Sequence, residues 1–217
     1  MVAGPRLAVP CRLMSSVLRP FVLVLIVGAF LAGLVVAWYL ASPAPSAGGA
    51  AISRMPEQPR IEGDFTLLDP QGRPVPWREI RGRPQLVFFG FTHCPEACPT
   101  TLLNASQALA DLGAAAADLR IVLISVDPQR DTPQAVGGFV ANFGPQVTGY
   151  TGDAAGIAAA AAAFHVFYEK MPPPDGGDYM VNHTATLFLL GSSDEILEII
   201  PYGATPTEIA AAVRRHL

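Results

Sequence analysis

One short apolar run, leading directly into a pair of cysteines, constrains the fold of this chain more than any other feature. Residues 84–91 (PQLVFFGF) are almost continuously apolar, which is the pattern of a buried parallel strand. The segment 92–98 (THCPEAC) follows at once, and a helix is predicted from Pro99 to Leu112. The chain must therefore place two sulfur atoms where a buried strand passes into a helix.

Strand and helix patterns continue to alternate after this unit. The predicted elements are a hairpin over 65–75, a strand over 121–126, a helix over 132–143, a strand over 147–151, a helix over 154–163, an extended segment over 164–168, a loop over 171–178, paired strands over 184–190 and 196–200, and a closing helix over 205–216. Such alternation, ending in a hairpin and a helix, predicts an α/β fold: a thioredoxin-like sandwich with a mixed central sheet.

The two cysteines can either bind a thiophilic metal or form a disulfide. Pro99 suits the first position of a helix, which would make Cys98 the N-cap and place Cys94 in the preceding loop. The positive end of the helix dipole favours a thiolate there, as both chemistries require. Three residues separate the cysteines, one more than in the usual redox pair. The wider loop eases chelation without forbidding a disulfide, so both alternatives stay open.

A third ligand would complete a metal site, and the chain has four histidines. His216 is terminal, His165 is expected to pack after an Ala-rich helix, and His93 should point away from the site if Cys94 points into it. His183 precedes a late strand that, in a thioredoxin-like fold, passes beside the cysteine loop. Two thiolates and an imidazole suit copper. Zinc remains the alternative, although structural zinc normally takes four protein ligands and only three are evident here.

Four further side chains near these motifs have two interpretations each. Met171 and Met180 could supply a soft fourth ligand, or they could be loop residues that fill gaps. Asp127 and Asp131, in the segment VDPQRDTP, could form an acidic surface for a partner beside the metal. Alternatively, they serve the turn after a strand, with Asp131 and Thr132 capping the next helix, and we favour this second interpretation.

The amino-terminal region predicts a membrane anchor. Residues 21–40 are twenty residues without a charge, long enough to span the ~30 Å core of a bilayer. Three arginines precede them and the next basic residue is Arg54, so the bias of positive charge puts residues 1–20 in the cytoplasm. Residues 41–60 then form a flexible linker and 61–217 the folded domain. A cleaved signal with a site near residues 44–46 is the alternative.

The charge and the cysteines of the chain indicate which compartment and which classes of partner to expect. Residues 55–217 carry ten basic and eighteen acidic side chains, which makes a nucleic-acid partner a poor expectation. Cys94 and Cys98 would lie in an exported domain where disulfides persist, and the anchor separates them from Cys11. No Arg/Ser-rich mitochondrial leader is evident, so we expect a bacterial inner (cytoplasmic) membrane, with the domain on the periplasmic or extracytoplasmic side.

Three motifs in order, FGFTHCPEACPTTL, VDPQRDTP and YMVNHT, resemble the Sco/SenC family of membrane-anchored copper proteins. The resemblance covers about residues 58–217. It implies that Cys94, Cys98 and His183 bind one copper ion, as Cu(I) or Cu(II). It also implies a role in assembling the dinuclear copper centre of cytochrome c oxidase, with oxidase subunit II or another copper chaperone as partner. Asn182 departs from the usual Asp of the family, which could weaken a hydrogen bond that supports the ligand.

Three functions therefore compete. The first is a metallochaperone, which is not primarily an enzyme. The second is a thiol–disulfide oxidoreductase with Cys94 as nucleophile and Cys98 as resolving thiol. The third is a redox or copper sensor. The segment 181–184 (VNHT) holds a histidine where thioredoxin-type reductases normally carry a proline, and this favours copper over the reductase.

Overall fold

The structure, a computed structural model, describes residues 29, 31, 58–173 and 177–217. Contacts divide the chain into two units, Met1–Arg54 and Met55–Leu217, and the fold below is that of the second. The predicted anchor and linker lie almost entirely outside the described residues, so both remain predictions. Among the residues that are described, none of the helices has the length and apolarity needed to cross a bilayer.

A five-stranded mixed sheet forms the centre of the domain, in the order β5-β4-β3-β8-β9. Strands β3 (Gln85–Gly90), β4 (Arg120–Ser125) and β5 (Val147–Tyr150) are parallel, and β8 (Leu187–Leu190) and β9 (Ile196–Ile200) are antiparallel additions. All six residues of β3 are buried, as the apolar run predicts. The mixed α/β prediction is confirmed.

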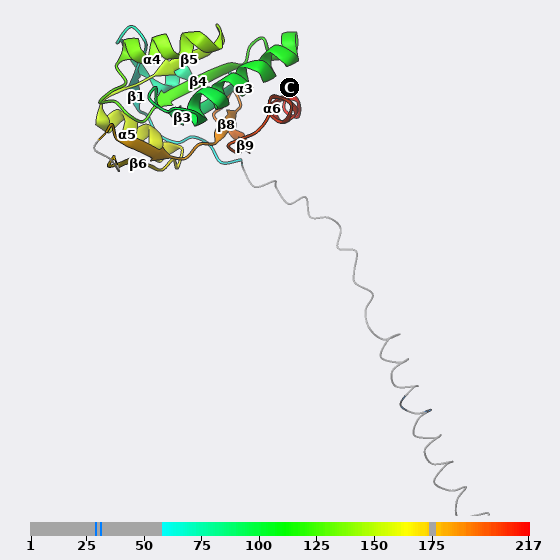
Figure 1. Ribbon diagram of the computed structural model, residues 1–217. Coiled ribbons are helices and arrows are strands. Elements are labelled where there is room, and N and C mark those ends of the chain that lie inside the picture. The colour runs from blue at the N-terminus through cyan, green and yellow to red at the C-terminus, as the bar shows by residue number, and fades with distance from the viewer. Residues whose placement is uncertain (1–28, 30, 32–57, 174–176) are drawn as a thin grey trace, which may run out of the picture. The chain divides into compact units, whose positions relative to one another are not determined.

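Two helices lie side by side next to the sheet (Figure 1). Helix α3 (Ala97–Leu112) follows the cysteine loop and continues into a 3-10 turn over Gly113–Ala116. Helix α6 (Pro206–Arg214) closes the chain, and it begins with a capping box in which Thr205 and Glu208 satisfy each other's backbone N–H groups. The closing helix is where the sequence predicts it.

The two remaining long helices also begin at residues whose side chains cap them. Helix α4 (Pro133–Val140) runs into a 3-10 turn over Ala141–Phe143, and the Thr132 hydroxyl accepts its Ala135 N–H at 3.2 Å. Helix α5 (Ala154–Ala163) begins after Asp153, and its bounds match the prediction.

A small hairpin and a short helix cover one part of the core. Strands β1 (Thr66–Leu68) and β2 (Pro74–Pro76) pair antiparallel, which confirms the predicted hairpin. Helix α2 (Trp77–Ile80), which the sequence analysis missed, follows directly. It buries Trp77, whose ring stacks on Phe65 with centroids 5.1 Å apart.

A second two-stranded ribbon lies outside the central sheet. Strand β6 (Tyr168–Met171) pairs antiparallel with β7 (Met180–His183), with Tyr168 opposite His183. The extended segment predicted over 164–168 is wrong, because Phe164 is the buried C-cap of α5 and the strand begins only at Tyr168. Strand β7 was not predicted, since most side chains of the ribbon are exposed and leave no apolar alternation.

Candidate metal centre

The cysteine loop passes into α3 two residues earlier than predicted, at Ala97 and not at Pro99. The helix begins at Ala97, so Cys98 stands in its first turn, and Glu96 is the N-cap without a side-chain capping bond. The prediction of Cys98 as N-cap is therefore wrong. The Cys94 sulfur accepts the Cys98 N–H at 3.3 Å. Because the first N–H groups of a helix lack intrahelical partners, Cys94 takes the part that a capping side chain would otherwise play.

The Cys98 side chain is fully buried and packs tightly against the end of β3. A Cβ atom added at Gly90 would stand 2.9 Å from the Cys98 sulfur and 2.8 Å from the Phe88 ring. Only glycine leaves room for the sulfur at this point of the strand. Gly90 is a site residue that was not predicted, and its one signal in the sequence is a glycine inside an otherwise bulky apolar run.

His183 reaches the cysteines from the end of β7. Its Nε2 atom lies 3.8 Å from the Cys98 sulfur, and its Nδ1–H donates to the Thr184 carbonyl at 3.0 Å. That second bond orients the ring and leaves Nε2 as the nitrogen that faces the sulfur atoms. Phe88 and Phe91 pack edge-on against the imidazole, with centroids 6.0 and 5.8 Å away.

The three donors fit one soft metal ion. With metal–sulfur and metal–nitrogen bonds of the lengths known for zinc, a sulfur and a nitrogen on one tetrahedral ion stand ~3.6 Å apart, close to the Cys98–His183 separation of 3.8 Å. No three His, Cys, Asp or Glu side chains of residues 58–173 and 177–217 already form a metal-holding group. Small movements of the side chains would therefore have to accompany binding.

The two thiols differ sharply in acidity. The Cys98 thiol stabilises the Cys94 thiolate by hydrogen bonding, and His183 adds to this against the opposing effect of burial, so the pKa of Cys94 falls to about 4. The same contact with Cys94, together with burial, raises the pKa of Cys98 far above its ordinary value. Both cysteines are free. The pair is therefore one partly exposed thiolate and one buried thiol.

The three histidines that the sequence analysis sets aside do not join the site. His93 is exposed, and its Nδ1 lies 3.0 Å from the Thr92 hydroxyl oxygen, in keeping with a side chain that turns away from the cysteines. His165 is exposed at a φ of 53°, so the expectation that it packs is wrong. His216 lies 3.4 Å from a carboxylate oxygen of Glu198.

The two methionines do not suit a fourth ligand position. Met171 and Met180 face each other across the ribbon, and both are exposed. Met180 precedes His183 by three strand residues, about 10 Å, and an odd spacing puts the two side chains on opposite faces. The prediction that they are gap-filling loop residues is wrong as well, because both belong to strands and face solvent.

Asp127 and Asp131 are buried, at 0% and 1% exposure, which excludes an acidic docking surface. Asp131 accepts hydrogen bonds from the Thr92 N–H at 2.9 Å and from the Ser125 hydroxyl at 2.6 Å. It ties the residues before Cys94 to the end of β4, whereas Thr132 alone caps α4. The structural interpretation is favoured, with the capping part assigned to one residue only.

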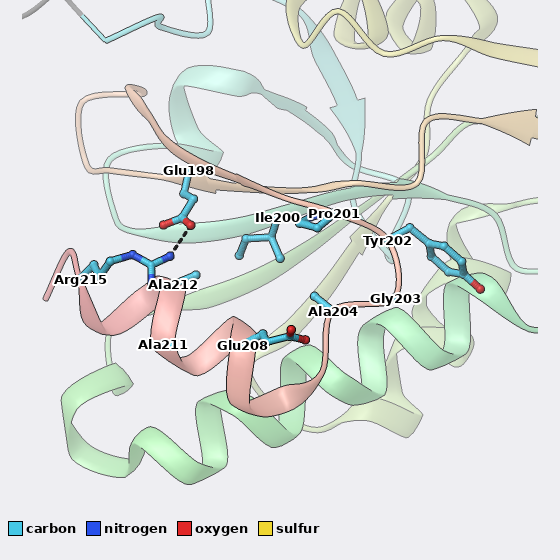
Figure 2. Close-up of a pocket in the computed structure, with 10 residues that line it drawn as sticks. All are labelled: Glu198, Ile200, Pro201, Tyr202, Gly203, Ala204, Glu208, Ala211, Ala212 and Arg215. Carbon is cyan, nitrogen blue, oxygen red and sulfur yellow. Dashed lines mark hydrogen bonds and ion pairs between the residues drawn. The ribbon is translucent and has the colours of Figure 1, made fainter.

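The pocket between β9 and α6 does not contain this site. It encloses about 410 Å³, and two of the residues that line it, Glu198 and Arg215, form an ion pair (Figure 2). Cys94, Cys98 and His183 are all absent from its lining. The candidate centre is thus a surface-proximal cluster at the carboxyl edge of β3, where parallel strands commonly carry function.

The family model described as SCO1/SenC matches residues 53–217, about three quarters of the chain. This chain belongs to the SCO1/SenC family. A curated relative, the human mitochondrial protein SCO1 homolog, is 33% identical over 162 residues. That alignment covers 74% of this chain but only 54% of the human protein, so the chain spans about half the length of this relative.

Solved structures of SCO1/SenC relatives share the fold. Arabidopsis thaliana ScoI with copper bound superposes with a TM-score of 0.66 at 30% identity, over 72% of this chain and 99% of that one. Bradyrhizobium japonicum ScoI with copper bound gives 0.64 at 38% identity, over 71% and 98%. BsSco is a member of the Sco family of cytochrome c oxidase assembly proteins in which a disulfide switch was identified. It superposes with a TM-score of 0.54 at 25% identity, over 73% of this chain and 96% of that one. These likenesses confirm the thioredoxin-like mixed α/β fold.

Proposed function

We propose that this protein is a copper metallochaperone that binds one copper ion through Cys94, Cys98 and His183. One observation carries the proposal: the Cys98 sulfur lies 3.8 Å from Nε2 of His183, which is 85 residues away along the chain, and the Cys94 sulfur accepts the Cys98 N–H. Copper favours such donors, and relatives of the same family hold copper in their structures. The proposed task is to take part in assembling the dinuclear copper centre of cytochrome c oxidase.

The acidity of the thiols suits reversible binding. Cys94 is already a thiolate near neutral pH, whereas Cys98 must lose its proton when it coordinates the metal. Cys94 is partly exposed and Cys98 is buried. Ligands of a partner would therefore reach the cargo from the side of Cys94 and His183, and transfer would proceed by exchange of one ligand at a time.

The proposal includes a location and a partner. Residues 21–40 would anchor the chain in a bacterial inner membrane by a single pass, with the domain on the periplasmic or extracytoplasmic side. The recipient or donor of copper would be cytochrome c oxidase subunit II or another copper chaperone. The description of BsSco as an oxidase assembly protein supports this assignment by family.

A second candidate function, thiol–disulfide oxidoreductase, is favoured by the low pKa of Cys94. In that reaction the Cys94 thiolate attacks a disulfide of an exported protein, and one sulfur of that protein leaves as a thiolate. The Cys98 thiol then gives its proton to the thiolate that left, and its sulfur attacks Cys94 in the mixed disulfide, which releases the second sulfur of the partner. The products are a Cys94–Cys98 disulfide and a reduced partner.

An anaerobic Cu(I) titration tests the copper proposal. The full chain, in detergent and with Cys11→Ser, should bind one copper per chain. The single changes Cys94→Ser, Cys98→Ser and His183→Ala should each abolish or strongly weaken binding. His93→Ala is the matched control, because this exposed histidine neighbours Cys94 and should leave the affinity unchanged. If His183→Ala leaves copper binding unchanged, or if the starting protein binds no copper, the oxidoreductase would be the better supported function.

A further inference from the structure

A buried carboxylate connects the loop after β4 to the ribbon that carries His183. Asp127 is 0% exposed and accepts hydrogen bonds from Arg130 Nε at 2.5 Å and from the Tyr179 hydroxyl at 2.7 Å. Lys170 Nζ, from β6, lies 3.8 Å from the same carboxylate. Because a buried charge is costly unless it is paired, these contacts hold Tyr179, the residue before β7, firmly against the loop.

Arg130 extends this connection to the metal centre. Its guanidinium lies 3.7 Å from the centroid of the Tyr179 ring and 5.8 Å from that of Phe91. A planar guanidinium stacks on aromatic faces in a way that an ammonium group does not reproduce. Phe91 in turn packs edge-on against the His183 imidazole, with centroids 5.8 Å apart and planes at 87°.

The ribbon has few other attachments to the domain. Val181 is the one fully buried side chain of β6 and β7, and the remaining seven are exposed or half-buried. A two-stranded ribbon on its own is only marginally stable in water. The position of His183, the last residue of β7, therefore depends on the contacts at Tyr179, on the burial of Val181 and on the packing of Phe88 and Phe91.

We propose that Arg130, held by Asp127 and stacked on Tyr179, is a positioning residue that fixes His183 against the two cysteines. This inference rests on the proposed copper site. Arg130 would act chiefly on the histidine, because the cysteine loop, whose Cys94 N–H donates to the Phe91 carbonyl, has further support from Asp131 through Thr92. Loss of a group that orients a metal ligand typically costs ~10–100-fold in metal affinity.

Two variants test the inference in the full chain with Cys11→Ser. Arg130→Lys keeps the charge but loses the planar stack, and Tyr179→Phe removes only the hydroxyl that donates to Asp127. The matched control is Arg81→Lys. Arg81 pairs with the buried Asp194 in the turn after β8, at the opposite end of β3 and ~20 Å from Phe91.

We expect Cu(I) affinity, measured by chelator competition, to fall ~10–100-fold in Arg130→Lys and by less in Tyr179→Phe, and to stay unchanged in Arg81→Lys. In a His183→Ala background, Arg130→Lys should cost nothing further, because its effect passes through the histidine. In the copper-free proteins, the NMR signals of the His183 ring should shift in the first two variants and not in the control.

Three results would overturn the inference: unchanged copper affinity in both variants, an equal loss with and without His183, or His183 signals that do not move. If urea unfolding shows that Arg130→Lys does not fold, Tyr179→Phe decides. Failure of the starting protein to bind copper would instead refute the proposed function. The two failures are therefore distinguishable.

Discussion

The two segments that bring ligands to the centre are built in opposite ways. Cys94 lies in the loop between the central strand β3 and the long helix α3, and Cys98, in the first turn of α3, is fully buried against Gly90. His183 lies at the end of a ribbon that pairs with no strand of the central sheet. The Cys98 sulfur thus lies in the core, the half-buried Cys94 packs against the core, and the imidazole lies at its edge.

This difference suggests how a site can hold a metal ion and still release it. Groups fixed in a close-packed interior move little, because every displacement disturbs many neighbours. A ribbon with one buried side chain can shift at lower cost. The cysteines therefore provide a fixed platform, and the histidine is the ligand whose position can change without disturbing the core.

The largest effect should come from disturbing the fixed half. Gly90→Ala places a Cβ atom 2.9 Å from the Cys98 sulfur, so we expect the free energy of unfolding to fall by about 1–3 kcal/mol and copper affinity to fall with it. Urea unfolding and Cu(I) competition measure the two effects. Gly138→Ala in α4 is the control, since nothing lies within 4 Å of the added atom. If both variants lost equal stability and copper affinity, the tight packing of Cys98 against Gly90 would be contradicted.

A comparable loss of stability should follow from loosening the cysteine loop. Asp131→Asn removes a buried charge that accepts bonds from Thr92 and Ser125, which should cost roughly 1–3 kcal/mol. The Thr92 amide should then exchange its hydrogen faster, whereas the ribbon amides should keep their rates. Hydrogen exchange followed by mass spectrometry or NMR checks this. Faster exchange in the ribbon as well would show that the two halves are not independent.

The ionisation of Cys94 provides a third test. Its pKa of about 4, against an ordinary value of 9.0, means that its thiolate absorbance should persist as the pH is lowered until about pH 4. Cys98→Ala removes the largest cause of the shift, so the pKa of Cys94 should rise towards its ordinary value. His183→Ala should raise it less, because the contribution of the histidine is smaller. Ultraviolet titration of each variant, made in the Cys11→Ser background, measures these pKa values. A larger rise for His183→Ala than for Cys98→Ala would show that the histidine, and not Cys98, is the main cause of the low pKa of Cys94.

The smallest effect should be that of Asn182→Asp. Asn182 is exposed on the ribbon, and strand alternation puts it on the face opposite to His183. The hydrogen bond that orients His183 goes to the backbone carbonyl of Thr184. We therefore expect copper affinity to stay unchanged by chelator competition. A gain of tenfold or more would show that residue 182 supports the ligand through a contact that forms only with copper.

Sequence patterns predicted the core around the cysteines better than they predicted the ribbon that carries His183. The apolar run of β3 and the Ala-rich α5 are strong local signals, and Thr132 caps its helix as expected. The ribbon was missed because its residues alternate in no apolar pattern, and because the prolines and glycines of residues 172–178, between its two strands, favour a loop. Its stability comes from contacts with distant residues, which local sequence does not reveal.

The candidate ligands were predictable, but their supporting residues were not. Cys94, Cys98 and His183 came from spacing, fold layout and resemblance, and the structure brings them together. The roles of Gly90 and Arg130 depend on what packs against them, a sulfur atom in one case and two aromatic rings in the other. Side chains that act through partners far along the chain leave no pattern in their own neighbourhood.

The separation of Cys98 from His183 along the chain, 85 residues, has a thermodynamic consequence. An ion held by both would act as a cross-link that closes a long loop, and it would bind the unfolded chain poorly because the donors are then far apart. Bound cargo would therefore raise the melting temperature, and delivery would lower it again. A carrier of this construction becomes easier to unfold at the moment it completes its task.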